Sequence, residues 1–147
     1  MINILEKKSD ENLEVAKECI KINRFNSAVS RMYYAAFQKI KGCILKDSKY
    51  CSCYPKIEHE GRIYQIFEHG IISVMIGHFL EYNKKSYDKD QCDITSVDIQ
   101  FLYHKRKEAD YYNNKIFEAK DNALIIEWLA KTEKIISFVN TNMNRMC

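Results

Sequence analysis

The sequence predicts an all-α protein, an antiparallel bundle of four or five helices in a single domain spanning residues 1–147. A chain of this length can bury one substantial core and is short for two. It contains one proline and four glycines beside 46% hydrophobic residues. So few turn-forming residues disfavour an all-β fold, which needs many tight turns, and favour a few long helices. A second observation that favours helices is a long segment with helical periodicity in the first third of the chain.

Residues 26–47, NSAVSRMYYAAFQKIKGCILKD, form that segment, around which the other helices are expected to pack. Asn26 or Ser27 is suited to cap a helix that runs without proline or glycine as far as Gly42. At helical spacing, apolar residues occupy two adjacent faces, first Ala28, Met32, Ala35 and Ala36 and then Val29, Tyr33, Phe37, Ile40 and Ile44. We therefore predict a central helix buried on more than one side, whose alanines let a neighbouring helix approach closely.

The flanking segments suggest the rest of the first half of the bundle. Residues 10–22 carry apolar side chains at helical spacing, and a short turn at 23–26 makes this helix and the central one an antiparallel hairpin. A long loop at 47–58 is broken by Pro55. Residues 60–82 then show a helical pattern that Gly70 and Gly77 weaken, so a bend or two helical pieces are expected there.

The second half contains two further predicted helices. Residues 83–93 are polar and predict a loop. Thr95, with Asp98 three residues later, resembles a capping box and opens the fourth helix. Residues 110–120 interrupt the pattern, and residues 121–141 carry the most regular apolar stripe of the chain, which predicts the last helix.

Composition bounds the environment and the partners. The net charge of +3, from 23 basic and 20 acidic residues, is compatible with binding to nucleic acid without requiring it. No apolar run reaches the length of about 18 residues needed to span a membrane. Residues 1–9 lack the features of a signal peptide, so we expect a cytoplasmic protein whose six cysteines are mostly reduced thiols.

Cys51 and Cys53, together with Cys92, are the only hint of a metal site in the sequence. Structural zinc sites typically use two C-x-x-C pairs or another set of four cysteine and histidine ligands. One C-x-C pair with a single distant cysteine falls short of that pattern. We therefore expect no metal and no other cofactor.

Three stretches resemble HEPN domains, in particular a subfamily of small stand-alone bacterial and archaeal members. The central-helix pattern A-V-x-R-x-Y-Y-A-x-F is matched at residues 28–37, a middle H-x-G at His59–Gly61, and a late R-x-x-A-D-Y at Arg106–Tyr111. The order and spacing of the three also fit, and the resemblance extends over about residues 10–142.

The resemblance implies a helical bundle that forms a homodimer and is often encoded beside a minimal nucleotidyltransferase. Many HEPN proteins are toxins or defence effectors that cut RNA without a metal. Their motif is an arginine followed, after four to six residues, by a histidine on a late helix. Here that count from Arg106 arrives at Tyr111 instead. A second spacing match, from Arg62 to His69, lies in the middle of the chain.

Arg106, Asp110 and Tyr111 are the candidate catalytic residues. RNA cleavage without a metal needs a base for the 2′-hydroxyl, an acid for the leaving oxygen and a cation for the phosphate. Arg106 supplies the cation, while a tyrosine hydroxyl, with an ordinary pKa of about 10, is a poor base that can still donate a proton. Asp110, or His104 one turn earlier, would complete the chemistry. The alternative is structural: the three residues pin the end of the fourth helix to Arg31 and Tyr34.

The candidate RNA- or nucleotide-binding residues are Arg31, Tyr34, His59, His104, Lys105 and Lys107. Tyr33 is expected in the core, and His59 is expected to cap a helix or to contact a phosphate at its start. His69 and His78 are given no role.

Three functions remain open. The first is a toxin–antitoxin or phage-defence protein that acts on RNA or nucleotides, with a degenerate R-x4-Y ribonuclease motif. The second is a non-catalytic substrate-binding or regulatory partner of a nucleotidyltransferase, which the tyrosine at the histidine position favours. The third is a dimerising scaffold without a ligand.

Overall fold

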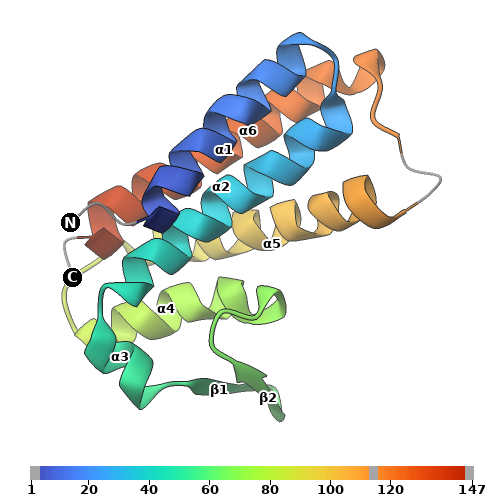
Figure 1. Cartoon of the computed structure of the whole chain (residues 1–147). Coiled ribbons are helices and arrows are strands. Elements are labelled where there is room, and N and C mark those ends of the chain that lie inside the picture. The colour runs from blue at the N-terminus through green and yellow to red at the C-terminus, as the bar shows by residue number, and fades with distance from the viewer. Residues whose placement is uncertain (1–3, 113–115, 145–147) are drawn as a thin grey trace.

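A computed structural model describes residues 4–112 and 116–144 and shows a bundle of helices with one small β-hairpin (Figure 1). The all-α helical bundle predicted from the sequence is confirmed. The elements, in chain order, are α1 (Ile4–Lys21), α2 (Phe25–Leu45), α3 (Ser48–Cys53), β1 (Lys56–His59), β2 (Arg62–Gln65), a 3₁₀ turn η1 (His69–Ile71), α4 (Ile72–Asn83), α5 (Lys89–Tyr111), a 3₁₀ turn η2 (Ala119–Asp121), α6 (Asn122–Phe138) and a π-helical turn η3 (Val139–Met143).

Helix α2 is the centre of the bundle, as its two apolar faces predict. It contacts α1, α4, α5 and α6, and Figure 1 shows it running between α1 and α5. Both faces are buried, because Ala28, Met32 and Ala35 on one and Tyr33 and Ile40 on the other are all 0% exposed. The close approach expected at the alanines is also present, since the Ser9 hydroxyl of α1 donates a hydrogen bond of 2.6 Å to the Ala35 carbonyl.

Replacing Ala35 with phenylalanine is expected to lower the free energy of unfolding by about 1–3 kcal/mol, because the ring would overpack the contact between α1 and α2. Urea denaturation followed by circular dichroism measures this. Ala130→Phe is the matched control, because Ala130 is exposed on α6. An unchanged unfolding midpoint for Ala35→Phe would contradict the close packing seen here.

The first hairpin departs from the prediction at both of its helix starts. Helix α1 begins at Ile4 rather than near residue 10, and its first turn is tied to the end of α2 by an ion pair of 2.8 Å between Glu6 and Lys46. Arg24 is the residue before α2, so neither Asn26 nor Ser27 caps that helix. The Asn26 side chain instead donates to the Ala109 carbonyl and accepts from the backbone N–H of Phe117.

The long loop predicted at 47–58 contains helix α3. The Asp47 carboxylate accepts from the backbone N–H of Tyr50 at 2.9 Å and so caps this helix. Tyr50 is fully buried, and burial of this one large side chain anchors a segment that is otherwise mostly polar. The loop prediction was therefore wrong for residues 48–53.

The helix predicted over 60–82 is also wrong in its first half, where β1 and β2 form an antiparallel hairpin. His59 pairs with Arg62, which leaves Glu60 and Gly61 as a two-residue turn. Both have positive φ, 50° and 76°, the conformation of the type I′ turns that suit β-hairpins and favour glycine. His59 consequently lies in a strand and caps no helix. Gly77 lies inside α4 without breaking it.

Helix α5 begins six residues before the predicted start. Asp88 caps it, accepting from the backbone N–H of Gln91 at 3.1 Å. Thr95 and Asp98 are buried inside the helix and form no capping box, and Asp98 is paired with Lys131 of α6 at 3.3 Å. The predicted interruption after residue 110 is confirmed where the chain is described, because α5 ends at Tyr111 and α6 begins at Asn122. Residues 113–115, within the predicted interruption, lie outside the described residues.

Candidate functional site

Four of the predicted site residues form one cluster around the guanidinium group of Arg106. Its Nε lies 3.0 Å from Oδ2 of Asp110, and its Nη2 donates to the hydroxyls of Tyr34 at 2.5 Å and Tyr111 at 2.9 Å. Arg106, Asp110, Tyr111 and Tyr34 are called the Arg106 cluster below. The Arg106 side chain is only 11% exposed, so these contacts hold the guanidinium in a largely buried position.

Two helices build the cluster. Asp110 follows Arg106 by four residues, which places the two side chains on one face of α5. Tyr34 comes from α2, and the guanidinium carbon lies 5.1 Å from its ring centroid and 4.9 Å from that of Tyr111. The Ser30 hydroxyl, also on α2, donates to Asp110 at 3.1 Å.

The charge of Arg106 is secured by these neighbours. Burial disfavours the ionised form, but the combined effect of Tyr34, Tyr111 and Asp110 outweighs it and raises the pKa of Arg106 above its ordinary value. One contact of the structural alternative is present, because Arg106 joins the end of α5 to Tyr34. Arg31 takes no part in that contact.

His69 is brought to the same place, although it was given no role from the sequence. Its Nδ1 lies 2.6 Å from the hydroxyl oxygen of Tyr33. Its ring is nearly parallel to that of Tyr103, at 6.2 Å and 7°, and lies 4.4 Å from that of Phe37. Burial lowers the pKa of His69, and the positive charges of Arg106 and Lys41 lower it further. At neutral pH the imidazole is therefore uncharged.

Nothing in the sequence pattern indicates that His69 lies beside Arg106 and the two tyrosines. The spacing match between Arg62 and His69 does not correspond to a contact, because the Arg62 guanidinium lies over the ring of Tyr64 in the hairpin, at 4.9 Å. His69 reaches the site through Tyr33, a residue that the helical pattern assigns to the core. Tyr33 is indeed 0% exposed, yet its hydroxyl forms a hydrogen bond with His69.

Two other predicted binding residues, Arg31 and Lys107, lie near the Arg106 cluster or His69. Arg31 donates to Asn12 of α1 at 2.9 Å and lines, with Tyr34 and Asp110, a cavity of about 660 Å³. Lys107 lies over the ring of Tyr103 at 5.2 Å, and the ring of Tyr103 is stacked with that of His69.

Three of the predicted residues make their contacts away from the Arg106 cluster. Lys105 pairs with Glu108 at 3.1 Å and lies over the rings of Phe101 and Trp128. His104 is exposed beside Gln100, and Nε2 of His59 lies 3.7 Å from a carboxylate oxygen of Glu60.

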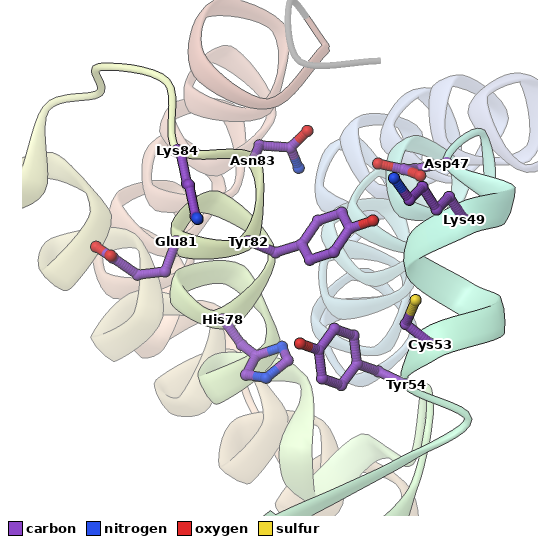
Figure 2. Close-up of a pocket in the computed structure, with 9 residues that line it drawn as sticks. All are labelled: Asp47, Lys49, Cys53, Tyr54, His78, Glu81, Tyr82, Asn83 and Lys84. Carbon is purple, nitrogen blue, oxygen red and sulfur yellow. The ribbon is translucent and has the colours of Figure 1, made fainter.

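A second cavity, of about 810 Å³, lies between α3 and α4 and is shown in Figure 2. Tyr54, His78 and Tyr82 point into it, with the Tyr54 and His78 rings 4.6 Å apart. Nδ1 of His78 is 2.8 Å from the hydroxyl of the buried Tyr50, which repeats the pairing of His69 with Tyr33. Burial alone lowers the pKa of His78. None of the predicted site residues lines this cavity.

Metal ligands do not gather in the described part of the chain. Among residues 4–112 and 116–144, no three His, Cys, Asp or Glu side chains are placed to hold a metal ion. Burial raises the pKa of the Cys51 and Cys92 thiols, which disfavours the thiolate form that binds metals. Cys147 lies outside the described residues.

The comparisons with known proteins assign no family. No family model matches the chain, and no curated protein matches it. Of the helices described, none has the length and apolar character needed to cross a membrane.

Proposed function

We propose that the protein acts on RNA or nucleotides, as a metal-independent ribonuclease whose Arg106 cluster binds the phosphate. The observation that carries this proposal is the fixed guanidinium group of Arg106, held between two tyrosine hydroxyls. Nη2 donates both hydrogen bonds that the guanidinium makes to described residues, and the buried Nε makes only its ionic contact with Asp110, which leaves Nη1 available to a phosphate oxygen. A cation held in place in this way stabilises the charge that develops on phosphorus without reorganising during the reaction.

The proton transfers would fall to groups of the same cluster. The Tyr111 side chain is 61% exposed, so its hydroxyl can reach a bound strand and donate a proton to the leaving oxygen. Asp110 accepts a hydrogen bond from Ser30 and is paired with Arg106, so its carboxylate lies beside the proposed phosphate position. Its carboxylate is thus the available base for the 2′-hydroxyl.

The biological setting and the assembly rest on the resemblance to HEPN domains alone. That resemblance supports a toxin–antitoxin or phage-defence system and a homodimer in which two Arg106 regions meet. A cytoplasmic location is part of the same proposal.

A second function, favoured by a specific observation, is that of a non-catalytic partner of a nucleotidyltransferase. Tyr111 stands where the nucleases of the family have histidine, and its hydroxyl already accepts from Arg106 at 2.9 Å. Asp110 compensates the charge of the same arginine. A cluster whose members satisfy one another in this way suits a structural or binding role as well as a catalytic one.

RNA cleavage by the wild type is expected to persist in the presence of a chelator, because the proposed chemistry uses side chains only. Tyr111→Phe keeps the ring over Arg106 and deletes only the hydroxyl, so it should slow cleavage without changing the melting temperature. Tyr111→His should raise activity by supplying a group that titrates near neutral pH. Cleavage assays of the three proteins, with melting temperatures measured alongside, test this. Absence of cleavage by both the wild type and Tyr111→His would favour the nucleotidyltransferase partner.

A further inference from the structure

His69 and Arg106 face the same pair of tyrosines, although they come from η1 and α5. The guanidinium carbon of Arg106 lies 6.0 Å from the Tyr33 ring centroid, and the His69 centroid lies 5.5 Å from it. Tyr34 is similarly shared, at 5.1 Å from the guanidinium carbon and 6.1 Å from the imidazole. The guanidinium group of Arg106 and the imidazole of His69 are therefore both packed against Tyr33 and Tyr34.

The hydrogen bond from Tyr33 determines which nitrogen of His69 carries the proton. Burial, followed by the nearby Tyr103, raises the pKa of Tyr33 well above its ordinary value, so its hydroxyl keeps its proton. Nδ1 of His69, at 2.6 Å, is the hydrogen-bond partner of this buried hydroxyl among the described residues, so we infer that the hydroxyl donates to Nδ1. Since the imidazole is neutral, its own proton is on Nε2. His69 thus offers an N–H group to a ligand rather than a lone pair.

The charged groups around His69 are mostly positive. Arg106 and Lys41 both act on its ring, Lys41 from above the rings of Phe37 and Phe67. Lys107 lies over Tyr103, which stacks on His69. The neighbouring acid in the sequence, Glu68, accepts from the backbone N–H of Gln65 in the hairpin. Asp110 is paired with Arg106. An anion at this place would relieve the repulsion among these cations.

We propose that Nε2 of His69 and Nη1 of Arg106 form a two-point binding site for one phosphodiester group of an RNA strand. The inference rests on the proposed function and names the residues that hold its substrate. The two donors come from separate elements that share contacts with Tyr33 and Tyr34, and we assign each of them to one oxygen of the same phosphate. Lys41 and Lys107 flank the site and add to its positive field.

Binding of a phosphate should favour the imidazolium form of His69, because a negative charge beside the ring stabilises its protonated state. The pKa of His69, lowered in the free protein, should therefore rise when the ligand binds. By linkage, the ligand should bind more tightly as the pH falls through this range. In the free protein, burial and the charges of Arg106 and Lys41 oppose protonation, and a bound phosphate would offset the repulsion from these two cations.

The test is an NMR titration of the histidine side chains in the full-length protein, with inorganic phosphate in one arm and a six-residue oligouridylate in the other. The free protein should show His69 as the Nε2–H tautomer, and both ligands should raise its pKa. His69→Gln, which can still bond to Tyr33, should weaken oligouridylate binding by about tenfold. His78→Gln is the matched control, because His78 has the same pairing with Tyr50, at 2.8 Å, but no cation among the causes of its lowered pKa.

Each result distinguishes this site from the proposed function. If oligouridylate binds but leaves the pKa of His69 unchanged, or if the two glutamine variants bind alike, the site is refuted and RNA binding stands. If inorganic phosphate raises the pKa of His69 but oligouridylate neither binds nor raises it, the anion site stands and the proposed RNA function fails. If neither ligand affects His69 and oligouridylate does not bind, both are overturned. The wild-type titration decides these cases even where a variant is poorly folded.

Discussion

Truncation of Phe79 to alanine is expected to lower the free energy of unfolding by about 3–5 kcal/mol. Phe79 is 0% exposed in α4 and meets the ring of Tyr50 edge to face, at 5.2 Å and 86°. Tyr50 is itself fully buried in α3. Loss of the phenyl group would leave a cavity between these two helices and remove the aromatic contact that holds α3 in place.

Urea denaturation measures this loss, and Val97→Ala provides the control. Val97 is 68% exposed on α5, so its truncation should change stability by less than about 0.5 kcal/mol. Phe79 makes none of the hydrogen bonds of the Arg106 cluster. Near-equal stabilities of the two variants would mean that α3 and α4 are not packed through this ring.

The helical periodicity of α2 was enough to predict the centre of the fold, because a helix buried on two faces leaves a pattern that no strand would produce. The hairpin at residues 56–65 was missed for the opposite reason. Ile63 and Ile66 fit a helical period as well as a short strand, and the turn depends on the positive φ of Gly61. Helix α3 depends on burial of Tyr50, which a polar stretch does not reveal.

The candidate site was predictable where its residues are close in the sequence. The spacing of Arg106 and Asp110 places them on one helical face, and Tyr34 was named as the residue to which the end of this helix would be pinned. His69 could not be predicted, because its position depends on how η1 packs against α2. Likewise, Arg31 turns toward Asn12 of α1, a contact that neither local sequence specifies.

Replacing Arg106 with alanine is expected to lower the rate of RNA cleavage by about 10²–10³-fold. The variant removes the positively charged group nearest the proposed phosphate position, together with its hydrogen bonds to Tyr34 and Tyr111. Arg106→Lys keeps the charge but has no planar group to bridge the two hydroxyls, so it should recover only part of the rate. Single-turnover cleavage of a labelled RNA measures these differences.

Arg62→Ala is the matched control for this variant. Arg62 also stacks on a tyrosine, at 4.9 Å from the Tyr64 ring, but it lies in the hairpin and its loss changes the net charge by the same amount. If RNA is attracted only by the overall positive charge, both variants should cleave more slowly by the same factor. If the site is at Arg106, only Arg106→Ala should cleave more slowly. The melting temperature of Arg106→Ala must be measured too, because the variant removes the ion-pair partner of Asp110. The Asp110 side chain, which is 28% exposed, then keeps only its hydrogen bond from Ser30. Equal cleavage by the wild type and a folded Arg106→Ala would place the chemistry elsewhere on the molecule.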